Sequence, residues 1–389
     1  MQLRWLHIAL LLFGLAGCQT IQFERPQTLS ASDWTTDDGQ ASRSRWHQEP
    51  IKAPLEKAWE YSANAGFGPG SPLLLQDRVL VATRNGEIHI VDLESGKTRG
   101  FKQMVDVVEG SPLIHQGTLY VPAAWGRKVL VAFDLAKGVN RWRQTGIPFA
   151  TSLVGHGDVV VGVDVEGNLR AIETDKGAEA WSLQLGSHLS VKASPIQVSD
   201  SSIIVADAEG GVRRVNLDSQ QIEWAVKLPA PVYVSPAADD KVVVLTTTRG
   251  SIHALDIATG ALRWERSVGA HIRMGAAALG PDAVYVGATD GWFRALSRTE
   301  GRELWSVGFG DVITAPPLVA GSTVYVGTLG SELAGLDAHT GKELWRTELE
   351  GRMKSAMAVA GDGLLVLTEP KWVVLFRPAA QDEGDRNAK

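Results

Sequence analysis

Short runs of alternating apolar and polar residues recur along the chain with a period of about forty residues. In the unit from Pro317 to Leu349, the expected strands cover 318–319, 324–328, 333–336 and 343–348, with turns rich in Gly, Ser and Thr between them. Period-two alternation bounded by such residues indicates β-strands. Each unit is therefore predicted to form four short strands.

A tryptophan marks the last strand of most units. It ends a phrase that consists of an acidic or small polar residue, three residues, usually a glycine, and three more residues, as in Asp256-Gly260-Trp264. A turn glycine can adopt positive φ, and a Trp between blades buries a large area. The structural tryptophans are Trp59, Trp142, Trp181, Trp224, Trp264, Trp305 and Trp345, and Gly100 stands where another is due.

A second marker counts the units independently. A pair of small residues, often Ser-Pro, precedes each first strand. Repeats of this length with short strands predict a β-propeller, and the eight pairs predict an all-β, eight-bladed propeller of four-stranded blades. The pairs are Ser71-Pro72, Ser111-Pro112, Thr151-Ser152, Ser194-Pro195, Ser235-Pro236, Gly275-Ala276, Ala315-Pro316 and Ser355-Ala356.

The two markers are offset at the ends of the chain. Trp59 precedes the first pair, and the eighth unit has no Trp after it. The strand with Trp59 is therefore predicted to be the outer strand of the last blade, whose other three strands come from the C-terminus. Closing the ring in this way removes a free sheet edge.

The first residues have the pattern of a targeting segment. Arg4 precedes an apolar stretch, 5–16, that is too short to span a bilayer comfortably. The stretch ends in Leu15-Ala16-Gly17-Cys18, which resembles the lipobox of bacterial lipoproteins. This resemblance implies a signal peptide over 1–17 and lipidation of Cys18, the single cysteine. Many such proteins are retained at the inner membrane by an aspartate directly after the cysteine. Because Gln19 occupies that position here, the resemblance implies that the protein is located at the periplasmic face of the outer membrane.

The remaining boundaries follow from composition. Residues 18–54 are polar without an apolar period and are predicted to be a flexible, lipid-anchored tether, in which Trp34 and Trp46 contact either the propeller or a partner. The propeller is assigned to 55–378, and 379–389 to a polar tail. The acidic pairs Asp37-Asp38 and Asp239-Asp240 are expected in solvated turns.

Composition gives little support to chemistry at a cofactor or metal. The net charge of -6 and the absence of a basic run argue against nucleic acid as a partner. One cysteine and nine scattered histidines provide no zinc-type spacing, and no nucleophile-elbow or P-loop pattern occurs. His89 and His253 occupy equivalent strand positions in units one and five, as repeat side chains would. We therefore expect no catalytic residue, no metal site and no cofactor.

One enzymatic alternative comes from the repeat. The form from Asp337 to Trp345 resembles the repeats of quinoprotein dehydrogenases, which hold pyrroloquinoline quinone and calcium in an eight-bladed propeller. Fold alone does not transfer function. Those enzymes are longer, and many use a vicinal cysteine pair that this chain cannot form. An envelope lipoprotein scaffold with some other partner is a further alternative.

The features in combination resemble the BamB family, the lipoprotein subunits of the outer-membrane β-barrel assembly machinery. Lipobox, polar segment, quinoprotein-like repeats and total length carry the resemblance, from Cys18 to Arg377. It implies a non-catalytic periplasmic scaffold that binds the POTRA domains of BamA and aids folding and insertion of outer-membrane proteins. The sequence leaves open whether the protein also contacts unfolded outer-membrane proteins directly.

The resemblance implies one partner-binding stretch, Leu189-Ser190-Val191-Lys192. Leu189 and Val191 would offer apolar contacts to BamA. Lys192 replaces an arginine of the family, which keeps the charge but loses the planar fork. The alternative is that Leu189 and Val191 are the first apolar positions of an inner strand.

A further contact is expected on the same face of the disc. Loops before the first strands and loops between second and third strands should share that face. Trp125, with Arg127 nearby in an insertion of unit two, has typical interface composition and is expected there. The family's acidic second contact has no equivalent in 229–234, where Tyr233 and two prolines stand instead.

Overall fold

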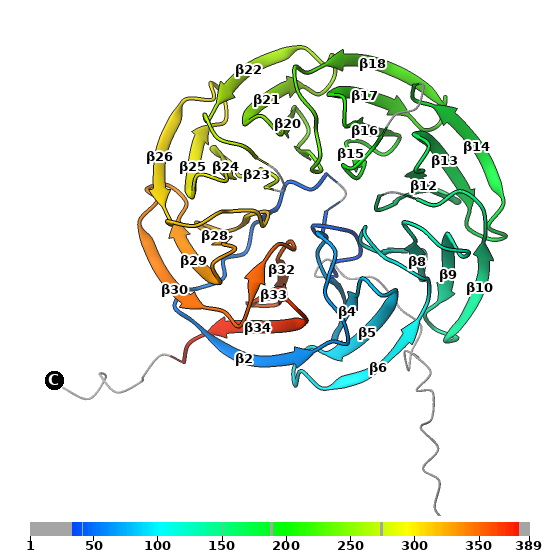
Figure 1. Ribbon diagram of the computed structural model, residues 1–389, viewed down its shortest axis with the longest axis horizontal. Helices are drawn as coiled ribbons and strands as arrows, with labels where there is room; N and C mark the ends of the chain where they lie inside the picture. The colour runs from blue at the N-terminus through cyan, green and yellow to red at the C-terminus, as the bar shows by residue number, and fades with distance from the viewer. Residues whose placement is uncertain (1–32, 41, 150, 187–189, 273–274, 381–389) are drawn as a thin grey trace, which may run out of the picture.

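The computed structural model describes residues 33–40, 42–149, 151–186, 190–272 and 275–380. They form eight β-sheets arranged in a ring (Figure 1). In this part of the chain, no helix is long and apolar enough to cross a membrane. The predicted eight-bladed β-propeller is confirmed.

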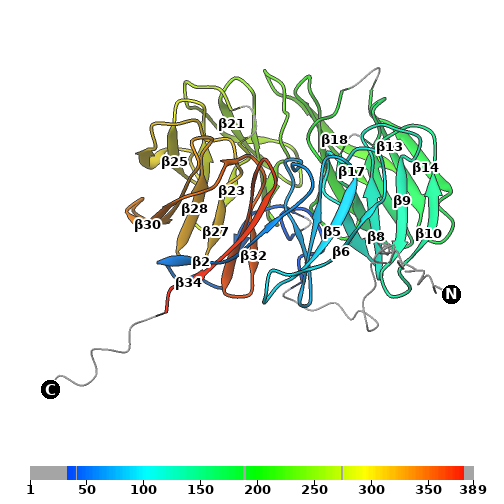
Figure 2. The ribbon, with the colours of Figure 1, turned by 60° about the horizontal axis from the view of Figure 1, so that its bottom comes forward.

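Blades 1 to 7 are antiparallel meanders that run from the centre of the ring to its outer wall (Figures 1 and 2). Blades 1 to 4 contain β3 (Leu73–Leu75), β4 (Arg78–Ala82), β5 (Glu87–Asp92), β6 (Thr98–Gln103); β7 (Leu113–His115), β8 (Thr118–Pro122), β9 (Leu130–Asp134), β10 (Val139–Gln144); β11 (Val154–His156), β12 (Val159–Val163), β13 (Asn168–Glu173), β14 (Glu179–Gln184); and β15 (Ile196–Gln197), β16 (Ser202–Ala206), β17 (Gly211–Asn216), β18 (Gln221–Lys227). Blades 5 to 7 contain β19 (Ala237–Ala238), β20 (Val242–Thr246), β21 (Ser251–Asp256), β22 (Leu262–Ser267); β23 (Ala278–Leu279), β24 (Ala283–Gly287), β25 (Trp292–Ser297), β26 (Glu303–Gly308); and β27 (Leu318–Ala320), β28 (Thr323–Gly327), β29 (Glu332–Asp337), β30 (Glu343–Glu348).

Blade 8 closes the ring with strands from both ends of the propeller. β2 (Leu55–Ser62) pairs antiparallel with β34 (Trp372–Pro378), and Trp59 lies opposite Leu375. The sheet continues through β33 (Gly363–Glu369) to β32 (Ala358–Ala360), and β31 (Arg352–Met353) pairs with the far end of β33. The predicted position of the Trp59 strand is therefore confirmed.

The repeated tryptophans pack against the blade that follows. Trp264 of blade 5 donates from Nε1 to the carbonyl of Arg298 in blade 6, at 2.8 Å. A Cβ atom at Gly301 would lie only 2.4 Å from the Trp264 ring. The glycine of the phrase thus meets two requirements, positive φ and room for the neighbouring indole. The same ring-on-glycine contact joins Trp59 to Gly96, Trp142 to Gly177, Trp224 to Gly260 and Trp305 to Gly341.

The N-terminal segment departs from the sequence prediction. Residues 33–54 were expected to belong to a flexible tether, but in the described part they pack into the propeller. Trp34 is buried and pairs with Leu74 of blade 1. β1 (Trp46–His47) adds a parallel strand to β27 of blade 7. The chain then reaches β2, so this segment crosses the centre of the ring (Figure 1).

Candidate functional site

All eight blades contribute to one central cavity of about 630 Å³. Its wall is built from the small residues that open each unit, among them Ser152, Ser194, Ser235, Ala276 and Ala356. Small side chains at these positions keep the centre open where eight inner strands converge. The small-residue pairs that precede the first strand of each unit therefore also contribute the lining of the cavity.

The N-terminal segment forms the floor of this cavity. Its start is held where the Asp33 carboxylate accepts a hydrogen bond from the Gln76 amide, in the turn between β3 and β4. Its end is held where the Gly321 amide donates to the carbonyl of His47, in the turn between β27 and β28. Both turns lie at the end of the channel opposite the loops that open the units. The segment therefore enters and leaves from one face, which we call the tether face, and the cavity opens on the other, the mouth face.

Backbone hydrogen bonds fix the segment across the channel. The amides of Ile114, Ala238, Leu279 and Val319 donate to carbonyls of Thr35, Ser42, Ser44 and Arg45, respectively. These donors lie in the innermost strands of blades 2, 5, 6 and 7. The innermost strand of a blade faces the channel, so no other strand of its own sheet can pair with that edge. The segment satisfies these edges as an added strand would.

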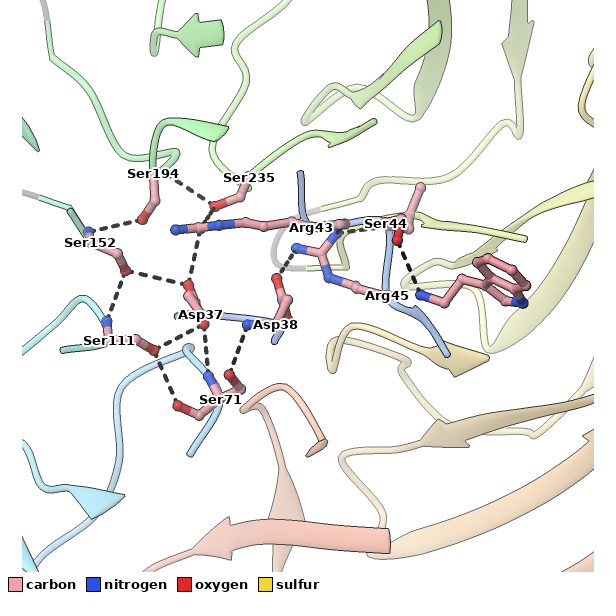
Figure 3. A network of polar contacts seen from close by, with 12 residues as sticks. Asp37, Asp38, Arg43, Ser44, Arg45, Ser71, Ser111, Ser152, Ser194 and Ser235 are labelled. Atoms are coloured by element: carbon pink, nitrogen blue, oxygen red, sulfur yellow. Dashed lines mark hydrogen bonds and ion pairs between the residues drawn. The ribbon is translucent and has the colours of Figure 1, made fainter. Parts of the chain in front are cut away.

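Asp37 is the centre of a buried polar network (Figure 3). Its Oδ1 accepts hydrogen bonds from the amide of Ser71 and the hydroxyl of Ser111, both at 2.9 Å. Its Oδ2 accepts from the Ser152 hydroxyl at 3.3 Å and forms an ion pair with Arg43 Nη1 at 3.0 Å. The Asp37 carboxylate thus contacts residues of blades 1, 2 and 3 and, through its ion pair, Arg43 of the N-terminal segment.

The serines of consecutive blades continue this network. The amides of Ser111, Ser152 and Ser194 each donate to the hydroxyl of the corresponding serine in the next blade, at 2.8 to 3.1 Å. The last of these hydroxyls, on Ser235, also accepts from Arg43 Nη1 at 2.7 Å. A closed circuit of polar contacts therefore runs from Asp37 through blades 2 to 5 and back through Arg43.

A second buried ion pair lies beside the first. Arg45 Nη2 is 2.6 Å from Asp38 Oδ2, and both side chains are almost fully buried. Arg45 Nη1 donates to the carbonyls of Arg43 and Ala277. Asp38, Arg43 and Arg45 all have positive φ, which is costly for residues with a Cβ and persists where surrounding contacts hold it.

The two carboxylates respond differently to this environment. Burial raises the pKa of Asp37, but the charge of Arg43 and the hydrogen bonds from Ser71 and Ser111 outweigh it, so the pKa lies below its ordinary value. Burial also raises the pKa of Asp38, the adjacent Asp37 charge adds to this, and Arg45 does not fully compensate. The prediction that Asp37-Asp38 is a solvated turn is therefore wrong, because charge pairing within the channel makes burial tolerable.

Two predicted partner-binding residues meet at the mouth of the cavity. Trp125, in the loop between β8 and β9, and Lys192, in the loop before β15, both line it. The expectation that these two kinds of loop share one face is confirmed. Trp125 is 60% exposed, and its loop is held by Asp106, whose carboxylate accepts from the Arg127 amide. Sequence reasoning did not select Val165, which also lines the mouth.

The other predicted residues lie elsewhere. Val191 is 3% exposed and packs in the core between blades 3 and 4, with Val163 and Ile203 among its cluster. The structure thus corrects the prediction that Val191 contacts a partner, because its side chain fills the gap between two sheets. Leu189 and Cys18 lie outside the described residues.

Exposed large apolar side chains are concentrated in two places. Among the described residues, one set lies on outer strands: Phe101, Val139, Ile222, Leu262, Leu304 and Leu344. The other set lies at the mouth face: Trp125, Val165, Tyr233 and Trp292. Single exposed apolar residues are common on protein surfaces, but Trp125, Val165 and Tyr233 line the same cavity.

The described residues contain no group of three or more His, Cys, Asp or Glu side chains able to hold a metal ion. His89 and His253 are buried in β5 and β21, as the repeat predicted. Burial lowers the pKa of both imidazoles, and Glu87 and Glu265, respectively, oppose this in part. Both histidines are therefore parts of the blades and lie outside the lining of the central cavity.

A protein-family model matches most of the chain. The family model described as outer membrane protein assembly factor BamB matches residues 36–185, 126–281 and 289–386. The relative of that name from Moranella endobia is 25% identical over 48% of this chain and 50% of its own length. The one from Bordetella pertussis is 23% identical over 78% of this chain and 89% of its own length. The chain thus spans about half of the first relative and most of the second.

Solved structures show the same fold. BamB from Moraxella catarrhalis superposes with a TM-score of 0.68 at 17% identity, covering 83% of this chain and 100% of that one. A europium-containing methanol dehydrogenase superposes with a TM-score of 0.74 at 12% identity, covering 90% of this chain and 98% of that one. At these identities the likeness concerns the fold alone.

Proposed function

Because the chain belongs to the outer membrane protein assembly factor BamB family, we propose that it is a non-catalytic scaffold subunit of the outer-membrane β-barrel assembly complex. In this role it binds the POTRA domains of BamA and aids folding and insertion of outer-membrane proteins. The family match over most of the chain is the observation that carries the proposal. Lipidation at Cys18 would anchor the protein to the periplasmic face of the outer membrane.

The mouth face is the proposed docking surface. Trp125, Val165 and Tyr233 supply exposed apolar area around the cavity, and Lys192 supplies a positive charge beside them. Aromatic anchors with an adjacent cation are typical of residues that contribute most to binding. The segment that leads toward the lipid anchor joins the propeller at the opposite, tether face.

The quinoprotein alternative has less support in this chain. The N-terminal segment occupies the centre of the ring with two internal ion pairs, Asp37 with Arg43 and Asp38 with Arg45. Each of the two carboxylates thus has an arginine counter-charge from the same segment. Adding pyrroloquinoline quinone with calcium and measuring bound absorbance after gel filtration tests this alternative, and retained absorbance would favour it.

Copurification from solubilised outer membranes tests the main proposal. A C-terminally tagged wild type should retain BamA, and the Trp125→Ala/Lys192→Glu variant should lose most of it. Leu262→Ala is the matched control, because Leu262 is a similarly exposed apolar residue on the outer wall, at 56%. Absence of BamA from the wild-type eluate would refute the proposed partner, and equal retention by all three proteins would refute the docking surface.

A further inference from the structure

Exposed aliphatic side chains line part of the rim where the tether face meets the outer wall. Neighbouring strands of a blade are antiparallel, so the hairpin between the third and fourth strands lies at the same end as the turn between the first and second. The outer strands of blades 1 to 7 therefore begin at the tether face. Four exposed residues occupy the first or second position of the outer strands in blades 4 to 7, and we call them the aliphatic arc: Ile222, Leu262, Leu304 and Leu344.

The arc differs from exposed apolar residues scattered over a surface. Its members are 38 to 56% exposed and recur at the same end of four consecutive blades, so they lie along one side of the ring. A single exposed apolar residue needs no explanation, but a row of them marks an interaction surface. Charges of both signs flank the arc, as at Arg302, Glu303, Lys342 and Glu343. The property that its members share is therefore an aliphatic side chain and not a net charge.

The proposed lipid anchor limits how far the tether face can move from the bilayer. Cys18 and Asp33 are 15 residues apart (33 − 18 = 15), and a chain of that length spans at most about 50 Å. Asp33 is held at the tether face, where its carboxylate accepts from the Gln76 amide at 2.7 Å. For the mouth face to reach the bilayer, the same residues would first have to cross the tether face and follow the outer wall. The tether face is therefore the side of the propeller that the anchor brings to the lipid.

We propose that the aliphatic arc contacts the phospholipid surface to which the protein is anchored. The propeller then stands with its tether face toward the bilayer and its mouth face away from it. This inference rests on the proposed function, because it requires lipidation at Cys18. The anchor chain enters at blade 1, whereas the arc lies across the ring on blades 4 to 7 (Figure 1), so the two attachments together restrain the tilt of the ring.

The chemistry of the arc suits a lipid surface. Aliphatic side chains enter the boundary between headgroups and acyl chains, and the gain in free energy grows with the apolar area that they bury. The anchor also keeps the arc at a high local concentration beside the lipid. A contact that is too weak to hold the unanchored protein on a membrane can therefore still orient the anchored one.

Energy transfer from a fluorescent donor to labelled lipid measures which face is near the bilayer. The full-length lipidated protein is placed in vesicles of phosphatidylethanolamine and phosphatidylglycerol that contain a headgroup-labelled acceptor. The donor is attached at Ala258→Cys, in the tether-face hairpin of blade 5, or at Arg249→Cys, in the mouth-face turn of the same blade. Both positions are exposed, and the single natural cysteine is the acylated one, so each variant offers one thiol for labelling. Transfer should be higher from position 258 than from position 249.

A second set of variants tests the arc itself. Leu262→Ser/Leu304→Ser/Leu344→Ser removes most of its apolar area and should lower the transfer from position 258. The matched control is Trp292→Ser, because Trp292 is 45% exposed but lies at the mouth face, and it should leave the transfer unchanged. Melting temperatures establish that each variant is folded. If the triple variant does not fold, Leu262→Ser, at the most exposed position of the arc, decides by itself.

The possible results separate this inference from the proposed function. Equal transfer from the two donor positions, in protein that stays with the vesicles, would overturn the orientation. Unchanged transfer in the folded arc variant would overturn the lipid contact, and loss of BamA from the same variant on copurification would assign the arc to a protein partner instead. Failure of the wild type to stay with the vesicles would refute the lipid anchor of the proposed function, and the inference with it.

Discussion

Arg43 and Asp37 form a buried ion pair across the central channel, with Arg43 Nη1 3.0 Å from Asp37 Oδ2. Arg43 also bonds to Ser235 of blade 5, whereas Asp37 bonds to residues of blades 1, 2 and 3. The pair therefore connects both sides of the ring through a segment that belongs to none of these blades. Five contacts depend on two side chains, which makes the pair a sensitive point for stability.

Removing the cation should destabilise the propeller strongly. Arg43→Met leaves the Asp37 carboxylate buried without its counter-charge, and we expect a loss of about 3–5 kcal/mol in the free energy of unfolding. The double variant Asp37→Asn/Arg43→Met should recover much of this loss, because the amide can still accept from Ser71 and Ser111. Denaturant titration measures both.

The matched control for this experiment is Arg302→Met. Arg302 pairs with Glu300 on the surface, where both side chains are 67% exposed, so its loss should cost less than about 0.5 kcal/mol. A similar small effect of Arg43→Met would contradict the assigned role of the buried pair.

The contact between Trp264 and Gly301 can be separated from the backbone requirement at Gly301. Gly301 and Gly269 have similar φ, +68° and +73°, but only a Cβ at Gly301 would meet another group. Gly269→Ala should cost about 1–2 kcal/mol for the left-handed backbone. Gly301→Ala should cost about 1–3 kcal/mol more, because the indole must move. Equal losses of stability in the two variants would show that the Trp contact contributes nothing.

Stability should fall as the pH decreases below the ordinary pKa of histidine. Burial lowers the pKa of His253 from 6.5, with partial opposition from Glu265. The unfolded chain then binds the proton at a higher pH than the folded chain does, so stability is lost as the pH falls below about 6.5 through the folded pKa. His253→Gln should show a smaller decrease in melting temperature between pH 7 and 5 than wild type.

The exposed His339 provides the control for that comparison, because His339→Gln removes a histidine from the surface of blade 7. The pH dependence of His253→Gln is therefore compared with that of His339→Gln as well as with that of wild type. An unchanged slope for His253→Gln would mean that His253 does not couple folding to pH.

Val191 and Lys192 are adjacent but should affect different properties. Val191→Ala removes buried apolar volume between blades 3 and 4 and should cost about 2 kcal/mol of stability without changing partner affinity per folded molecule. Lys192→Glu should change stability by less than about 0.5 kcal/mol and weaken binding of POTRA domains. Thermal unfolding and titration on the same preparations test both statements, and a reversed pattern would restore Val191 to the partner surface.

Membrane attachment depends on Cys18 in the proposed function. Cys18→Ser should move the protein from the membrane fraction to the soluble periplasmic fraction, with an unchanged melting temperature of the propeller. Immunoblots of fractionated cells provide the readout. Continued membrane association of Cys18→Ser, in cells that lack BamA binding through Trp125→Ala, would contradict lipid anchoring.

The sequence by itself determined the blades. The Trp phrase and the small-residue pairs repeat because every blade has the same local requirements. Each blade needs a tight turn, a contact with the next blade and small residues at its narrow inner end. Such requirements act within one unit or between neighbours, and therefore appear as periodic residues. Even ring closure could be predicted, since Trp59 lies one unit too early for a strand of blade 1.

Only the tertiary structure decided the centre of the ring. Asp37 and Arg43 carry no periodic signal, and their positions depend on hydrogen-bond donors from blades that are distant in sequence, such as Ser235. A polar stretch that would be solvated in isolation becomes buried because the closed ring offers it unpaired strand edges and counter-charges. One sequence feature pointed to this arrangement: the acidic pair Asp37-Asp38 is followed by the basic residues Arg43 and Arg45. Their charges are complementary, but the sequence does not show that a closed ring buries them together. Likewise, the packing of blades 3 and 4 buries Val191 and leaves Lys192 exposed. The alternation of residues along a single strand does not show which of its two faces is buried.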